Sequence, residues 1–142
     1  MMNPIFRECR ELIGQIDGLY HEAALKLNLT DSELNILYVL CVHGPGCLQS
    51  TFYKETEMSK STVNSAVKKM EREGLLCLKP GEGRNTCVYA TDAGNALMNN
   101  TVCRLIELED KIYDAWSPEE QQTFLRLNRD YTERFRKIVE SL

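Results

Sequence analysis

The 142-residue sequence has no long apolar run, only two histidines and no C-x-x-C cysteine pair. A transmembrane helix needs about 20 consecutive apolar residues, so none is expected. The start, M-M-N-P-I-F-R-E-C-R, lacks the apolar segment and small-residue cleavage site of a signal peptide. The cytoplasm is therefore the expected location.

In a reducing cytosol the six scattered cysteines are expected to be free thiols, with Cys41 in the core. Their spacing argues against a zinc site.

The sequence also lacks a catalytic constellation. Gly81-Glu82-Gly83 is the nearest approach to a phosphate-binding glycine loop, but it lies in a hairpin turn rather than between a strand and a helix. The paired carboxylates Glu119-Glu120 are explained by favourable charge at a helix start. We therefore expect no enzyme activity, no cofactor and no metal.

Charge is distributed unevenly along the chain. The net charge is −4, yet residues 54–84 hold seven basic and five acidic side chains, a net of +2, and the remainder carries −6. A composition of 43% hydrophobic and 27% charged residues is ordinary for one globular domain. The modest basic excess favours a phosphate-facing surface in residues 54–84.

Residues 59–74 predict an amphipathic helix. Ser59 is suited to cap its start, and Gly74 is suited to end it. An apolar stripe of Val63, Ala66, Val67 and Met70 lies opposite a polar and basic face. An ordinary solvated face is the simpler interpretation, but the short donors and acceptors in the first turns favour contact with bases in a major groove.

The segment before this helix, residues 47–57, predicts a second short helix after the break at Gly44-Pro45-Gly46. Leu48, Phe52 and Thr56 are expected to face inward. Two helices joined by about three residues form a helix-turn-helix. Gln49 and Ser50 would then hold a phosphate near the helix start.

After the polar helix, residues 75–79 and 86–90 predict two strands joined by a Pro-Gly-Glu-Gly turn. This hairpin carries Arg84 at its tip, where a guanidinium suits a narrow minor groove. Glu82, two residues earlier, can hold that guanidinium when DNA is absent, or orient it toward the groove when DNA is bound. Helix, turn, helix and basic hairpin together predict a DNA-binding unit.

The rest of the sequence predicts helices. The first helix spans residues 3 to about 27, and the second follows a capping box at Thr30 and Glu33. A long helix is expected from Thr91 to about residue 115. The last helix is expected from Ser117 to about residue 140. The first and last helices carry more apolar surface than a small head can cover. A monomeric bundle is possible, but a homodimer is favoured because two heads can read a palindrome.

This order of elements resembles the multiple-antibiotic-resistance-type (MarR) regulators. The resemblance rests on Leu29-Thr30, Ser61-Thr62-Val63, the run from Met70 to Leu75, Glu82-Gly83-Arg84, and the run from Thr91 to Gly94. It implies a mainly α fold with a small β-hairpin wing, in which residues 30–94 form a winged helix-turn-helix head and residues 1–28 and 95–142 form a helical dimerisation region. Family members are homodimeric transcriptional regulators, mostly repressors, and many lose DNA affinity on binding small aromatic or phenolic ligands.

The sequence departs from the family pattern at three positions. Glu82 replaces the usual Asp, Ala90 replaces a leucine, and Ser65 stands where many members have arginine. A guanine-rich operator is therefore not predicted. The DNA-binding residues predicted from the motifs are Gln49, Ser50, Ser59, Lys60, Ser61, Thr62, Asn64, Ser65, Lys68, Lys69, Arg84 and Asn85.

Two further sites are weaker hypotheses. Tyr20, His21, Tyr38 and Trp116 are candidates for an effector pocket, although each is also explained as ordinary core. Some relatives sense peroxides through a cysteine of the first helix, where Cys9 lies, but no partner residues for that chemistry are recognisable. The alternatives to a DNA-binding regulator are a winged helix for protein–protein contact, without DNA binding, and a thiol-based redox-sensing regulator.

Overall fold

The computed structural model describes residues 1–142 and is mostly helical, with one small sheet. In chain order the elements are α1 (Pro4–Lys26), α2 (Asp31–His43), β1 (Gly46–Leu48), α3 (Gln49–Glu55), α4 (Lys60–Arg72), β2 (Leu76–Pro80), β3 (Thr86–Ala90), α5 (Asp92–Asn100), α6 (Val102–Asp114) and α7 (Pro118–Glu140). The predicted fold class, mainly α with a hairpin wing, is confirmed. No helix has the length and apolar character needed to span a bilayer.

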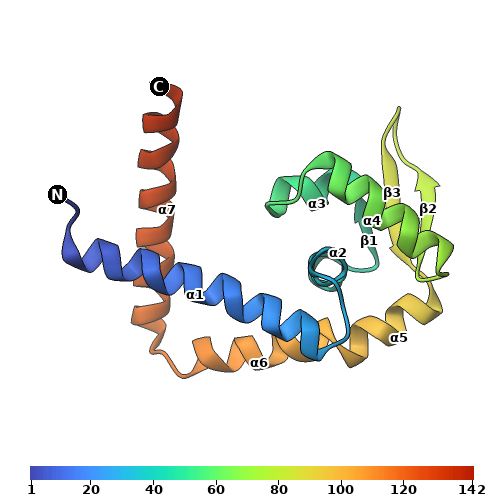
Figure 1. Ribbon diagram of the computed structural model, residues 1–142, viewed down its shortest axis with the longest axis horizontal. Helices are drawn as coiled ribbons and strands as arrows, with labels where there is room; N and C mark the ends of the chain where they lie inside the picture. Colours follow the sequence, from blue (N-terminus) through green and yellow to red (C-terminus); the bar gives the residue numbers. More distant parts are fainter. The chain divides into compact units, whose positions relative to one another are not determined.

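The chain divides into two compact units, Met1–Arg104 and Leu105–Leu142. In the first unit α2 is the central helix and packs against α1, α3, α4, α5 and β1 (Figure 1). Its side chains Ile36, Leu37 and Leu40 are almost completely buried. Thr30 and Glu33 form the predicted capping box, in which each backbone N–H donates to the side chain of the other residue.

The sheet has three antiparallel strands in the order β1-β3-β2. The hairpin pairs Cys77 with Tyr89, and β1 pairs Cys47 with Val88. The prediction that residues 47 and 48 belong to a helix is wrong, because they form β1 on the free edge of β3. Leu48 is consequently 39% exposed rather than inward-facing, whereas Phe52 is fully buried as predicted.

The predicted long helix from Thr91 to about residue 115 is interrupted at Thr101, which separates α5 from α6. Thr101 has φ −127° and ψ −92°, and its hydroxyl donates to the carbonyl of Leu97 at 2.6 Å. The preceding residues Asn99 and Asn100 have low helix propensity. A side chain that binds the backbone of the previous turn therefore ends the helix here.

Two glycines permit close or unusual backbone geometry. Gly74 has φ +77° and ends α4, as expected for a left-handed helix terminus. A Cβ added at Gly94 would lie 2.1 Å from the carbonyl oxygen of Leu75, so only glycine lets the start of α5 approach the residue before β2 this closely.

The second unit contains most of α6 and the whole of α7. Ser117 and Glu120 form a capping box at the start of α7, and Pro118 occupies its first position, as predicted. Hydrogen bonds from Ser117 to the Glu120 carboxylate lower the pKa of this carboxyl. Tyr113, Trp116 and Phe124 pack edge to face around the turn between the helices.

Candidate nucleic-acid interface

The orientation of α4 is fixed at its start and along its buried side. The Ser59 hydroxyl accepts a hydrogen bond from the Thr62 backbone N–H at 3.1 Å and donates to the Thr62 hydroxyl at 2.9 Å. Val63, Val67 and Met70 are at most 1% exposed. The predicted stripe therefore locks one face of α4 into the core and leaves the opposite face to solvent.

The solvent face of α4 combines small polar groups with lysines. No acidic residue occurs from Ser59 to Lys69. Every residue predicted for DNA contact on this helix is exposed: Ser59, Lys60, Ser61, Thr62, Asn64, Ser65, Lys68 and Lys69. Such a face suits the polar edges of base pairs at its centre and phosphates at its margins.

Some of these side chains are held by neighbours. Lys60 Nζ lies 5.3 Å from the centroid of the Tyr53 ring, a cation–π contact. Lys69 Nζ is 3.7 Å from a carboxylate oxygen of Glu73, an exposed pair that contributes little to stability. Lys68 has neither kind of partner, so its charge is available to an approaching phosphate.

Gln49 and Ser50 open α3 and are half-buried. The side-chain amide of Gln49 donates to Asn64 Oδ1 at 2.5 Å. This contact connects the first helix of the helix-turn-helix to the centre of the exposed face of α4. The sequence had suggested only a phosphate contact for Gln49, and it gave no sign of this pairing across 15 residues.

The wing ends in a tight turn. Gly81 N–H donates to the Asn85 carbonyl at 2.7 Å, Asn85 N–H donates to the Glu82 carbonyl at 3.2 Å, and Gly83 has φ +63°. Arg84 and Asn85 are exposed at the tip of the hairpin, which extends beyond α4 in Figure 1. The ion pair between Glu82 and Arg84 does not form, since no guanidinium nitrogen of Arg84 lies within 4.0 Å of a Glu82 carboxylate oxygen. The guanidinium is therefore unpaired.

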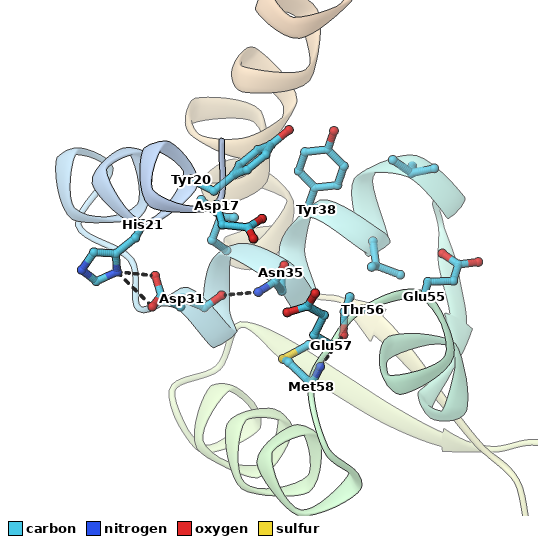
Figure 2. Close-up of a pocket in the computed structure, with 13 residues that line it drawn as sticks. Asp17, Tyr20, His21, Asp31, Asn35, Tyr38, Glu55, Thr56, Glu57 and Met58 are labelled. Carbon is cyan, nitrogen blue, oxygen red and sulfur yellow. Dashed lines mark hydrogen bonds and ion pairs between the residues drawn. The ribbon is translucent and has the colours of Figure 1, made fainter. Parts of the chain in front are cut away.

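A cavity of about 710 Å³ lies on another side of the first unit, between α1, α2 and the α3–α4 connection (Figure 2). Tyr20, His21 and Tyr38, three of the predicted effector residues, line it. Trp116 is not among the lining residues and packs against Tyr113 and Phe124 in the second unit. Sequence analysis missed the acidic lining residues Asp17, Asp31, Glu55 and Glu57, although helical spacing places Asp17 one turn before Tyr20 and His21.

The cysteines differ from expectation. Cys41 of α2 and Cys103 of α6 form a disulfide with a Cα–Cα distance of 6.1 Å, and Cys41 is half-buried rather than in the core. Tertiary packing, which composition does not reveal, brings these two residues within disulfide range. Cys9, Cys47, Cys77 and Cys87 are free, and Cys9 is exposed. Burial, together with the nearby Glu55 carboxylate, raises the pKa of Cys47 to about 11, so this thiol is protonated at neutral pH.

Comparison with known proteins agrees with this geometry. Residues 27–84, which include the helix-turn-helix and most of the wing, match the model of the MarR family. No curated protein sequence matches the chain closely enough to count as a relative.

Solved structures share the fold over nearly the whole chain. A MarR family regulator from Neisseria meningitidis superimposes with a TM-score of 0.79 at 20% identity, covering 99% of this chain and 98% of that one. A putative MarR family transcriptional regulator from Listeria monocytogenes, solved with a 26mer DNA, gives 0.71 at 19% identity over 94% and 89%. The PcaV transcriptional regulator from Streptomyces coelicolor, solved with its natural ligand, gives 0.64 at 20% identity over 94% and 97%. Residues 27–84 therefore match the MarR family, and the chain shares the winged-helix fold of these solved structures.

Proposed function

We propose that this chain is a homodimeric DNA-binding transcriptional regulator that represses by occupying a palindromic operator. The observation that carries the proposal is the exposed polar face of Ser59 to Lys69, which contains no acidic residue, together with the unpaired Arg84 of the wing. In this arrangement α4 enters a major groove, and the wing reaches the adjacent minor groove. The Listeria monocytogenes protein of the same fold was solved with a 26mer DNA, which supports DNA binding by this chain.

The homodimer is supported by unusually apolar exposed faces on the terminal helices. On α1, Ile5 is 75% and Leu12 is 49% exposed, and on α7, Phe124, Leu127 and Phe135 are 46–51% exposed. Contiguous apolar stripes of this length mark interaction surfaces. A second copy of the chain is the proposed partner, because two symmetric heads give the palindromic recognition that one short helix cannot supply.

A small aromatic ligand is proposed to release the operator. The cavity between α1, α2 and the α3–α4 connection has a volume typical of ligand sites and is lined by Tyr20 and Tyr38. Its lining also includes Glu57 and Met58, which immediately precede the Ser59 cap of α4. A ligand that displaces this connection would shift the reading helix and lower the affinity for DNA.

The test is to select host DNA fragments with the purified chain and to measure binding of the enriched duplex by fluorescence anisotropy. We expect preference for a palindrome over a shuffled duplex of equal composition. Replacing Lys68 with Gln should weaken binding to both duplexes similarly and reduce the salt slope by about 1. Equal affinity for selected and shuffled duplexes at all salt concentrations would instead favour a winged helix used for protein–protein contact.

A further inference from the structure

The cavity beside α1 and α2 has a strongly asymmetric charge. Its lining contains four carboxylates, from Asp17, Asp31, Glu55 and Glu57, and no lysine or arginine. Two of the four are already paired with histidines. His21 Nδ1 lies 2.9 and 3.0 Å from the Asp31 carboxylate oxygens, and His43 Nε2 lies 2.7 and 2.9 Å from those of Glu55.

The other two carboxylates, those of Asp17 and Glu57, have no hydrogen-bond or ion-pair partner within the chain. Figure 2 shows both carboxylates directed toward the middle of the cavity, on either side of Asn35, whereas Asp31 turns toward His21. Both carboxylates are exposed and line the same cavity, so a bound cation would be attracted to each of them.

Aromatic and apolar groups complete the cavity. Tyr20 and Tyr38 both line the cavity, and both side chains are half-buried (Figure 2). Leu34 and Val39 of α2 contribute buried apolar surface. A tyrosine ring attracts a cation through its negative face, and it also stacks on the aromatic part of a ligand.

We infer that this cavity binds an organic cation with an aromatic ring, whose positive group lies between Asp17 and Glu57 and whose ring packs against Tyr20 and Tyr38. An aromatic carboxylate of the same shape is disfavoured, because it would bring a third unpaired negative charge between these two. The inference rests on the proposed function in one respect, since it assigns the ligand class of the proposed effector site.

The position of Glu57 connects binding to DNA affinity. Glu57 is two residues before Ser59, whose hydroxyl caps α4. A cation bound at Glu57 would therefore shift the α3–α4 connection, and this connection determines where α4 begins. Binding at this cavity and binding of operator DNA are expected to be coupled, and the coupling must be reciprocal.

The experiment uses three naphthalene probes that differ mainly in charge: naphthylmethylammonium, neutral naphthylmethanol and anionic naphthoate. Isothermal titration calorimetry on the full chain should show the ammonium compound binding most tightly and weakening as salt concentration rises. Asp17→Asn and Glu57→Gln should each weaken the ammonium compound roughly tenfold and leave naphthylmethanol unchanged. Asp17→Glu, which keeps the charge, should retain most of the affinity.

Glu22→Gln is the matched control, because Glu22 is an exposed carboxylate of α1 outside the cavity lining. It should leave all three affinities unchanged. Three outcomes would each overturn the inference. Naphthoate could bind as tightly as the ammonium compound, or no probe could bind at all. The cavity variants could also have the same effect on binding as the control variant. Operator affinity, measured without any probe, tests the proposed function separately: a chain that binds the ammonium compound but no DNA would refute regulation while leaving the cation site intact.

Discussion

Gln49 at the start of α3 donates a side-chain hydrogen bond to Oδ1 of Asn64 on the exposed face of α4. Because Oδ1 accepts this bond, the amide Nδ2 of Asn64 remains available as a donor toward DNA. Acceptors on base edges in the major groove, such as purine N7 and thymine O4, are its natural partners. Gln49 is thus a positioning residue for a predicted base-reading residue.

Asn64→Ala should reduce the affinity for the best operator by about 1–3 kcal/mol, with the loss concentrated at one base position of each half-site. Gln49→Ala should cause part of the same loss, and the double variant should lose no more than Asn64→Ala alone, so it falls short of the sum by the whole Gln49→Ala loss. Anisotropy titrations on wild-type and singly changed operators measure this cycle. Ser50→Ala, which removes a predicted phosphate contact at the adjacent position, should combine additively with Asn64→Ala. Strictly additive losses for Gln49→Ala and Asn64→Ala would show that Gln49 does not orient Asn64.

The unpaired guanidinium of Arg84 yields a second prediction. Arg84→Ala should lower operator affinity most on A·T-rich flanks, where a narrow minor groove concentrates negative potential. Arg84→Lys should restore only part of the loss, because an ammonium lacks the planar guanidinium. Glu82→Gln changes the same turn but removes no ion pair to Arg84, so it should not reduce affinity. Gel-shift titrations with duplexes of differing flanks decide the matter, and unchanged affinity for Arg84→Ala would remove the wing from the interface.

The exposed apolar face of α7 yields a third prediction. Leu127 is 51% exposed and lies on the stripe with Phe124 and Tyr131. Leu127→Asp should shift the protein from dimer to monomer or aggregate, because the interface would bury an unpaired charge. Gln122→Asp adds the same charge at an exposed position on the opposite face of α7 and should stay dimeric. Light scattering at micromolar concentration distinguishes these outcomes, and a wild-type monomer mass would contradict the proposed dimer directly.

The features predictable from sequence were those fixed within a few residues. Ser59, Thr30 and Ser117 cap helices because a hydroxyl can reach the free amides of its own first turn. Gly74 ends α4 because its backbone adopts a positive φ. These local rules also placed the helix-turn-helix and the hairpin, since each depends on short-range periodicity and turn chemistry.

The features that sequence analysis missed depend on distant partners. The three-residue strand β1 exists only because β3 offers it an open edge, and nothing in Gly46-Cys47-Leu48 itself demands a strand. The pairing of Gln49 with Asn64 and the convergence of Asp17 with Glu57 on one cavity likewise require the fold. A single sequence gives the residue types, and tertiary packing decides which of them meet.

The bond between Cys41 and Cys103 is the clearest such case and gives the last prediction. It joins residues 62 positions apart. In the chain-entropy account, such a bond lowers the conformational entropy of the unfolded state and thereby raises the free energy of unfolding by about 4 kcal/mol. Urea unfolding of the oxidised protein should therefore show a higher free energy of unfolding than the same protein in reductant. Cys103→Ser should resemble the reduced wild type with or without reductant, whereas Cys9→Ser, at an exposed free thiol, should behave as wild type. Thiol titration in denaturant should count four free groups before reduction and six after it. Six reactive thiols in protein that was never exposed to reductant would show that this pair remains reduced, and the stability difference should then vanish.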